Sequence, residues 1–147
     1  HQLLGVFAER WVEPLSRVLH RLGSKHVLVV HSTDGLDELS ISAPSYVAEL
    51  VEGQVHTYVF QPEDAGIKRQ PLDALRVDSP LESARMIRGI FAGQSSPAAD
   101  MVALNSGAAL YAADVVSSVR EGVDMARSVL ASGAAVETLN RLVEHTA

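Results

Sequence analysis

The sequence predicts an α/β fold, with helices flanking a partial central sheet. Between Trp11 and Leu22, apolar residues recur at helical spacing, which predicts an amphipathic helix. Residues 27–30 form an apolar, largely β-branched run without alternation, typical of a strand buried on both faces of a parallel sheet. From Ser79 onward, serine caps and glycine stops divide the chain into helices. A helix that leads into a buried strand and is followed by further helices indicates helical layers on a sheet.

Composition narrows the classes of function. The chain has 147 residues, 47% of them apolar, which is enough for one sizeable core, and we expect one α/β domain over residues 1–147. The 12 Lys and Arg residues oppose 18 Asp and Glu, for a net charge of -6, and no basic block occurs. A nucleic-acid or anionic-membrane partner is therefore not expected. The absence of cysteine excludes disulfides, thiolate metal sites and cysteine nucleophiles. No apolar stretch approaches the roughly 20 residues that span a bilayer, and we expect a cytoplasmic protein.

The first helix should bury one stripe of side chains. Its inward face would carry Leu15, Val18, Leu19 and Leu22. Gly23 stands where such a helix would end. Pro14 then falls in the first turn, where the N–H groups have no intrahelical partner for a proline to remove.

A hairpin is predicted after the buried strand. Residues 46–51 and 55–60 are rich in β-forming side chains and are separated by Glu52-Gly53-Gln54, the pattern of an antiparallel pair joined by a short turn. We expect its aromatic residues Tyr46, Tyr58 and Phe60 to pack against the body of the domain rather than to form a stacking platform. Residues 61–79 show no sustained period and predict an irregular connection.

The remaining residues predict four helices with clear boundaries. Ser79-Pro80-Leu81-Glu82 and Ser96-Pro97 each place a capping serine before a proline, and Ser118-Val119-Arg120-Glu121 is a capping box. Gly93 and Gly133 mark helix ends. The inward faces would carry Ala84, Ile87 and Phe91 in the first helix, Met101, Leu104, Ala108, Tyr111 and Val115 in the second, and Val136, Leu139 and Val143 in the last.

Three carboxylates fall within five residues at Asp34-Gly35-Leu36-Asp37-Glu38, on the loop that follows the buried strand. Open α/β sheets usually bind ligands at the carboxyl ends of their strands. Magnesium is typically held by one or two carboxylates together with substrate phosphates, so an adjacent Asp-Glu pair suits a metal–diphosphate site. The alternative is an acidic loop that serves only as a turn and helix cap. The spacing alone leaves both possibilities open.

Two other polar residues are expected to be structural. His31 ends the buried strand, and a hydrogen bond to loop backbone explains its position without a role as a ligand. Asn105 lies on an otherwise apolar helix and is expected to tie that helix to a loop. The other five histidines lack the spacing of a zinc motif, so the sequence predicts no zinc site.

Motifs along the whole chain match one family in order and spacing. They are Leu-Gly-Val-Phe at 4–7, Leu-Gly-Ser-Lys at 22–25, Val-Val-His at 29–31 and Asp-Gly-Leu-Asp-Glu at 34–38. Further on come Val-Ala-Glu-Leu at 47–50, Pro-Glu-Asp-x-Gly at 62–66 and Leu-Asn-x-x-Ala-Ala-Leu-Tyr at 104–111. In these motifs the chain resembles the C-terminal α/β part of the anthranilate phosphoribosyltransferases, enzymes of tryptophan biosynthesis.

The resemblance implies a magnesium-dependent glycosyltransferase in the intact parent, with the C-terminal fold of the nucleoside phosphorylases and phosphoribosyltransferases. Asp37 and Glu38 match the family's pair that binds Mg²⁺ associated with the diphosphate of phosphoribosyl pyrophosphate. The amino group of anthranilate would displace pyrophosphate from C1 of the ribose. No catalytic residue is assigned, because positioning of the two substrates would supply most of the catalysis.

The chain also departs from the family. The N-terminal helical domain, the Gly-rich diphosphate loop and the anthranilate-binding residues have no counterpart in it, so we expect the 147-residue chain to be inactive alone. Ser32 stands where relatives often have glycine. The alternatives are a pyrimidine nucleoside phosphorylase-like enzyme and a non-catalytic complementing or binding fragment. The missing N-terminal domain would be its partner, and exposed apolar faces or strand edges would favour self-association.

Overall fold

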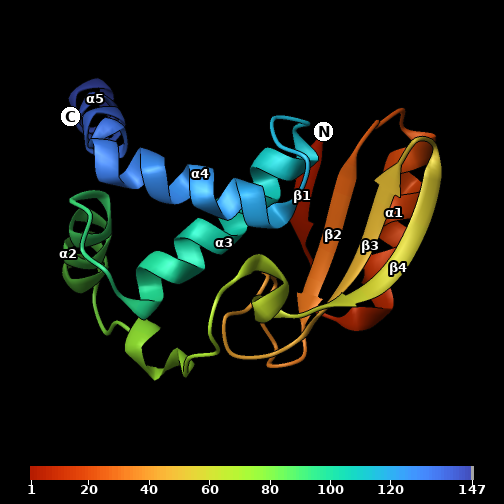
Figure 1. The fold of residues 1–147 in the computed structure, drawn as a ribbon, viewed down its shortest axis with the longest axis horizontal. Coiled ribbons are helices and arrows are strands. Elements are labelled where there is room, and N and C mark those ends of the chain that lie inside the picture. Colours follow the sequence, from red (N-terminus) through yellow and green to blue (C-terminus); the bar gives the residue numbers. More distant parts are fainter. Residues whose placement is uncertain (147) are drawn as a thin grey trace.

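A computed structural model describes residues 1–146 and shows a four-stranded sheet with helices on both faces (Figure 1). The strands are β1 (Gln2–Gly5), β2 (Val27–Ser32), β3 (Ser45–Val51) and β4 (Gln54–Phe60), in the order β1-β2-β3-β4. β1 and β2 are parallel, whereas β2–β3 and β3–β4 are antiparallel. The α/β class and the hairpin are therefore confirmed. The buried strand, β2, was predicted to lie in a parallel sheet. Its pairing with β1 is parallel, but its pairing with β3 is antiparallel.

The crossover from β1 to β2 contains the short 3-10 helix η1 (Glu9–Trp11) and the helix α1 (Val12–Arg21). Helix α1 packs on β2 and β3, over the face that presents Val27, Val29, Ala48 and Leu50. Leu15 and Leu19 contact this face as predicted, but Val18 is 46% exposed and Leu22 is 76% exposed. Two of the four residues predicted to be buried on this helix, Val18 and Leu22, are therefore exposed. Val12 and Ser16 are buried in place of Val18 and Leu22, which rotates the buried face of the helix.

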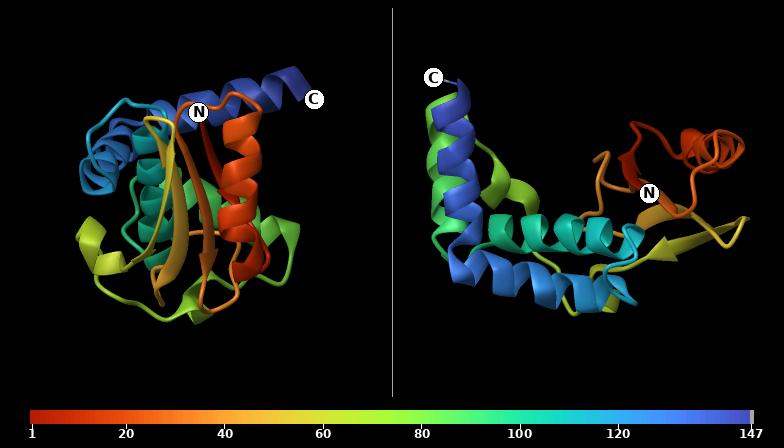
Figure 2. Two further views of the ribbon diagram at one scale, coloured as in Figure 1. Left: turned by 90° about the vertical axis from the view of Figure 1, so that its right-hand side faces the viewer. Right: turned by 90° about the horizontal axis from the view of Figure 1, so that it is seen from above.

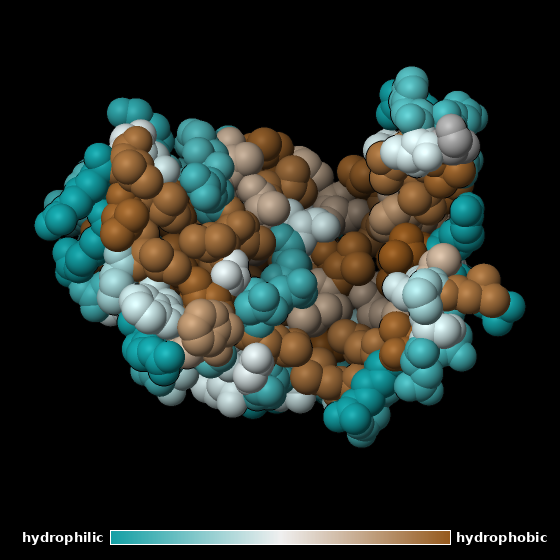
Figure 3. Space-filling model, turned by 180° about the vertical axis from the view of Figure 1, so that it is seen from behind, coloured by the Kyte–Doolittle hydropathy of each residue, from teal (hydrophilic) through white to brown (hydrophobic). Residues whose placement is uncertain are grey.

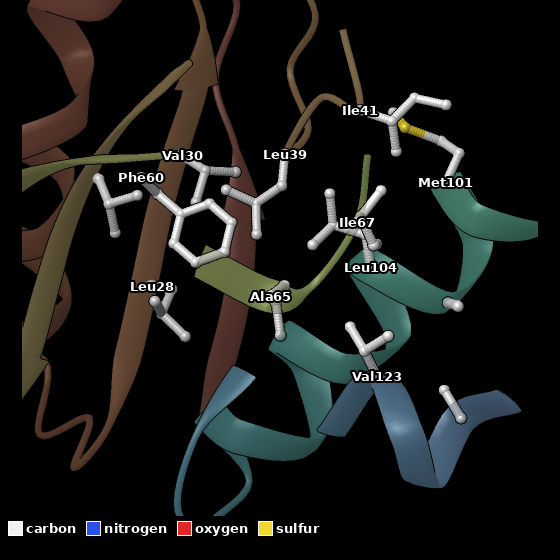
Figure 4. Packing of buried hydrophobic residues seen from close by; sticks show 14 of the residues in the cluster. Leu28, Val30, Leu39, Ile41, Phe60, Ala65, Ile67, Met101, Leu104 and Val123 are labelled. Atoms are coloured by element: carbon white, nitrogen blue, oxygen red, sulfur yellow. The ribbon is translucent and has the colours of Figure 1, made fainter. Parts of the chain in front are cut away.

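The opposite face of the sheet carries the larger core. Leu28, Val30 and Val47 of the sheet pack with side chains of α3 (Pro97–Ala112) and α4 (Val119–Ser132). Figure 4 shows this packing around Leu104 and Val123. The connection after β4 contributes through the 3-10 helix η2 (Pro62–Ala65), which places Ala65 and Ile67 in the core. Phe60 is 8% exposed, so its predicted packing against the body is confirmed.

Helices α3 and α4 cross in direct backbone contact. A Cβ atom on Gly107 would lie 2.5 Å from the backbone nitrogen of Val123, and one on Gly122 would lie 2.3 Å from the carbonyl oxygen of Gly107. Because Cβ atoms do not approach backbone atoms so closely, only glycine fits at both positions. This contact fixes the position of α4 against α3, the helix that packs on the sheet.

Helices α2 (Pro80–Phe91) and α5 (Ala134–Thr146) form an arm at the end of α3 and α4 that lies away from the sheet (Figure 2). A third 3-10 helix, η3 (Leu72–Leu75), precedes α2. The predicted capping serines are confirmed: Ser79, Ser96 and Ser118 accept hydrogen bonds from the backbone N–H groups of Glu82, Ala99 and Glu121. No helix within residues 1–146 is both long and apolar enough to cross a membrane.

Several predicted inward faces on these helices are wrong. Ala84 and Ile87 of α2 are exposed, and Ile90 is buried instead. Val115 lies beyond the end of α3 and is 56% exposed. Helix α2 meets its neighbours only at the arm, away from the main core, so apolar spacing along the helix does not determine which side is covered.

Candidate functional site

The predicted acidic loop occupies residues 33–44, directly after the carboxyl end of β2. Strand β2 extends two residues further than the apolar run and includes His31 and Ser32. The loop closes on itself: the Gly35 N–H donates to the Ser32 carbonyl at 2.9 Å, and the Thr33 N–H donates to the Pro44 carbonyl at 2.9 Å. Its first turn is therefore compact and fixed to the strand.

Asp34 has a structural role in this loop. Its Oδ1 accepts a hydrogen bond from the Ser32 hydroxyl at 2.5 Å, and its Oδ2 accepts one from the Ser40 hydroxyl at 2.6 Å. Ser32 itself is fully buried, so the hydroxyl at this position is accommodated and used. For Asp34 the turn interpretation is the right one, because both of its oxygens already have donors.

The carboxylates of Asp37 and Glu38 have surroundings that differ from those of Asp34. Both side chains are exposed, and within residues 1–146 neither carboxylate takes part in a hydrogen bond or an ion pair. Partial burial of the Glu38 carboxyl group, together with the charge of the neighbouring Asp37, raises the pKa of Glu38. Two adjacent carboxylates with no protein donors carry uncompensated negative charge, which a cation would offset.

The next residue, Leu39, fixes the pair to helix α3. Its N–H donates to Asn105 Oδ1 at 3.0 Å, and its carbonyl accepts from Asn105 Nδ2 at 3.0 Å. The same amide group donates to the carbonyl of Met101 at 3.2 Å, and the Leu39 side chain is 1% exposed. The structure thus confirms that Asn105 ties its helix to a loop, and it shows that the loop is the one that carries Asp37 and Glu38.

Strand β1 holds the loop from the other side. A Cβ atom on Gly5 would lie 1.5 Å from the carbonyl oxygen of Asp37, so the loop backbone rests directly on this glycine. His31 Nδ1 lies 2.9 Å from the carbonyl oxygen of Val6, which confirms its predicted hydrogen bond to backbone. The sequence did not predict β1 or the role of Gly5. In the sequence, the role of Gly5 is signalled only by the presence of a glycine inside an apolar stretch.

Such a loop can bind a hard cation. Carboxylate oxygens are the ligands that Mg²⁺ prefers, and Mg²⁺ keeps several waters. It therefore requires exposed carboxylates rather than a closed protein cage. Asp37 and Glu38 satisfy this chemistry, since both are exposed, while the backbone on either side is fixed by Gly5 and Asn105.

Comparison with known proteins places the chain in a family. The model of the "Glycosyl transferase family, a/b domain" matches residues 1–136. The anthranilate phosphoribosyltransferase of Thioalkalivibrio sulfidiphilus is 56% identical over 147 residues, which is 100% of this chain and 44% of that protein. The chain thus spans less than half the length of this relative.

Solved structures show the same fold. The crystal structure of anthranilate phosphoribosyltransferase from Thermus thermophilus superposes with a TM-score of 0.86 and 43% identity, over 95% of this chain and 41% of that one. The enzyme from Saccharomyces cerevisiae, in complex with phosphoribosyl pyrophosphate and Mg, superposes with a TM-score of 0.85 over 97% of this chain and 41% of that one. At 19% identity, the yeast structure supports the fold alone. With a family model that covers nearly all of its length, this chain belongs to the glycosyl transferase family defined by that α/β domain.

Proposed function

We propose that the chain forms the magnesium-binding α/β part of an anthranilate phosphoribosyltransferase. The observation that carries the proposal is the Asp37-Glu38 pair, exposed and without protein donors on a loop that is fixed from both sides. Similarity to anthranilate phosphoribosyltransferases at 56% identity supports the choice of reaction. The activity belongs to the whole enzyme, of which the chain represents 44% in that relative.

In this proposal Asp37 and Glu38 bind Mg²⁺ through their carboxylates. The ion would neutralise charge on the diphosphate of phosphoribosyl pyrophosphate as it departs. The loop positions the two carboxylates before substrate arrives, because Asn105 and Gly5 already fix the backbone on either side of them. Such positioning lowers the barrier by removing the entropy of assembling the reacting groups.

The reaction forms a bond between the amino nitrogen of anthranilate and C1 of the ribose, and it breaks the bond from C1 to the diphosphate oxygen. Pyrophosphate leaves with the bonding electrons, and the amino nitrogen loses a proton. No nucleophile from the protein is required. This agrees with a loop whose free groups are carboxylates rather than activated hydroxyls.

A chimera tests the proposal directly. The preceding part of the Thioalkalivibrio sulfidiphilus enzyme, joined to this chain, should form phosphoribosyl anthranilate from anthranilate and phosphoribosyl pyrophosphate in the presence of Mg²⁺. Asp37→Ala and Glu38→Ala should each lower kcat/KM by at least about tenfold, and higher Mg²⁺ should restore part of the loss. Anthranilate fluorescence provides the assay.

Asp73→Asn is the matched control. It removes one negative charge from an exposed carboxylate, 87% accessible, outside the loop, and it should leave kcat/KM unchanged. A folded chimera that is indifferent to both loop changes would refute the metal assignment. Phosphorolysis of thymidine in place of transfer to anthranilate would favour the pyrimidine nucleoside phosphorylase alternative. Activity of the chain without the added part would overturn the expectation that it is inactive alone.

A further inference from the structure

A second polar cluster lies at the other end of β2, where the strand begins. It contains His26, which immediately precedes β2, His1, which precedes β1, and Asp114, which follows α3. His26 is 4% exposed, whereas the His1 and Asp114 side chains are 41% and 63% exposed. These residues are far apart in the sequence, which explains why histidine spacing gave no sign of the cluster.

The buried ring of His26 is held between two carboxylates. Its Nε2 lies 3.1 Å from Oε1 of Glu49, and its Nδ1 lies 2.6 Å from Oδ1 of Asp114. A neutral imidazole has one N–H. If that N–H donates to Glu49, a lone pair on Nδ1 faces the Asp114 carboxylate. A metal ion bound at Nδ1 would offset the negative charge of the carboxylate that faces this lone pair.

Glu49 is itself fixed as an acceptor. Its Oε1 accepts from the Tyr111 hydroxyl at 2.7 Å, and its Oε2 accepts from the Tyr58 hydroxyl at 3.1 Å. Both tyrosine hydroxyls therefore donate to Glu49, one to each carboxylate oxygen. This arrangement directs Nε2–H of His26 toward Glu49 and leaves Nδ1 as the ligand atom, as in metal-bound histidines whose other ring N–H donates to a carboxylate.

His1 completes a set of three ligands. Its Nδ1 lies 3.6 Å from Oδ2 of Asp114 and donates a hydrogen bond to the carbonyl oxygen of Ala112 at 2.7 Å, a bond that coordination of a metal would replace. One ligand atom from each of His1, His26 and Asp114 lies within 4.8 Å of the other two. The carbonyl groups at the C-terminal end of α3 add partial negative charge at this position, which favours a cation.

We propose that His1, His26 and Asp114 form a binding site for a zinc-like divalent transition metal. Zinc bonds of about 2.0–2.1 Å in tetrahedral geometry place ligand atoms about 3.3 Å apart. The observed separations of 2.6 Å and 3.6 Å between Asp114 and the two histidines lie within 1 Å of that value. Since His1 and Asp114 are on the surface, small side-chain movements bring them into place. Imidazole nitrogens favour such a metal over Mg²⁺.

The site is open to solvent. A surface hollow of about 610 Å³ reaches His26 and Asp114 and is also lined by His20, Lys25 and Glu52. Solvent in this hollow supplies both a path of entry and a water as the fourth ligand. Bound metal would join the start of β1, the start of β2 and the end of α3. Metal binding would therefore hold these three chain segments together. It would stabilise the folded state, because the complete set of ligands exists only in that state.

Calorimetric titration of the full 147-residue chain with Zn²⁺ tests the site. The chain should bind one equivalent, and saturation should raise its melting temperature relative to the protein in EDTA. Asp114→Asn retains a side chain that tolerates the left-handed backbone there, with φ of 58°. Asp114→Asn and His1→Gln should each weaken Zn²⁺ binding at least tenfold and abolish the melting shift.

Two controls separate this site from other zinc ligands. His20→Gln alters a histidine that lines the same hollow and lies outside the set of three, and Asp73→Asn alters an exposed carboxylate outside both proposed metal sites. Both should leave Zn²⁺ affinity unchanged. Circular dichroism of each variant in EDTA establishes that it is folded. Absence of binding by the wild-type chain overturns the proposal, as does equal affinity in wild type, Asp114→Asn and His1→Gln, or loss of affinity in His20→Gln or Asp73→Asn.

Discussion

Glu38 is electrostatically unfavourable in the folded chain without a bound cation. Partial burial of its carboxyl group and the charge of Asp37 raise its pKa above the ordinary value of 4.5. The folded state therefore binds this proton more tightly than the unfolded state. Consequently, the contribution of Glu38 to stability falls as the pH rises from 4.5 through the raised pKa, and it stays unfavourable above that range.

Replacing this carboxylate by an amide should stabilise the chain at neutral pH. Exposed charges contribute about 0.5 kcal/mol or less, so Glu38→Gln should raise the melting temperature by about 1–2 °C at pH 7. Below pH 4.5 the two proteins should melt together, since Glu38 is then protonated. Thermal unfolding followed by circular dichroism measures both values. Glu9→Gln, at an exposed carboxylate in η1, is the control, and an equal gain in that variant would contradict the assignment to Glu38.

At the scale of elements, the contact between α3 and α4 depends on a pair of glycines. Gly122→Ala would place a methyl group 2.3 Å from the Gly107 carbonyl oxygen, and backbone on both sides prevents easy relief. The helices would have to separate. We expect a loss of about 1–3 kcal/mol in the free energy of unfolding, measured by urea denaturation.

Gly89→Ala provides the matched comparison. This glycine is also helical, but an added Cβ would meet the side-chain Oε1 of Gln94 at 2.5 Å, and that flexible group can move away. Alanine is favoured over glycine inside a helix by about 0.5–1 kcal/mol. Gly89→Ala should therefore be neutral or stabilising. Similar losses in both variants would contradict the assignment of the Gly122→Ala loss to its backbone contact with Gly107.

The sequence predicted the elements whose signals are local. Capping by Ser79, Ser96 and Ser118 and the hairpin turn at Gly53 involve neighbours in the chain, and both are confirmed. Strand β1 was missed because its four residues form a strand only through pairing with β2. The exposure of Ile87 was missed because the position of the arm, not helical spacing, decides which side of α2 is covered.

For the candidate loop, too, the local features could be predicted from the sequence, whereas the tertiary contacts could not. Three acidic residues were visible in the sequence, but not which of them lacked partners. Asp34 is occupied because Ser40 reaches back to it, and this bond exists only in the folded loop. The link from Leu39 to Asn105 spans 66 positions along the chain. Without an alignment, no sequence pattern indicates such a pair.

At the scale of the whole molecule, the arm formed by α2 and α5 encloses an apolar recess together with helices α3 and α4. It has a volume of about 490 Å³ and is lined by apolar residues that include Phe91, Val102, Leu110 and Val129. Figure 3 shows hydrophobic side chains gathered in the hollow between the arm and the rest of the molecule. Within residues 1–146, β1 pairs only with β2 and leaves one edge open. Exposed apolar surface and an open strand edge both promote association.

We therefore expect the isolated chain to self-associate. Sedimentation velocity should show a weight-average mass that increases with protein concentration. Val129→Lys places a charge in the recess, where Val129 is 46% exposed, and should reduce association. Val115→Lys, at a 56% exposed position after α3, should not. A monomer at every concentration would refute the expectation.

The contact between Gly5 and the Asp37 carbonyl also has a consequence for the order in which the chain folds. Gly5 reaches its final place only when β1 has paired with Val30 of β2. A parallel pair requires the intervening helix as a crossover, and such non-local pairing is slow compared with closing a hairpin. The β3–β4 hairpin can form early, whereas the two carboxylates acquire their positions only after this crossover closes. The acidic loop is therefore among the last parts of the molecule to reach its folded structure.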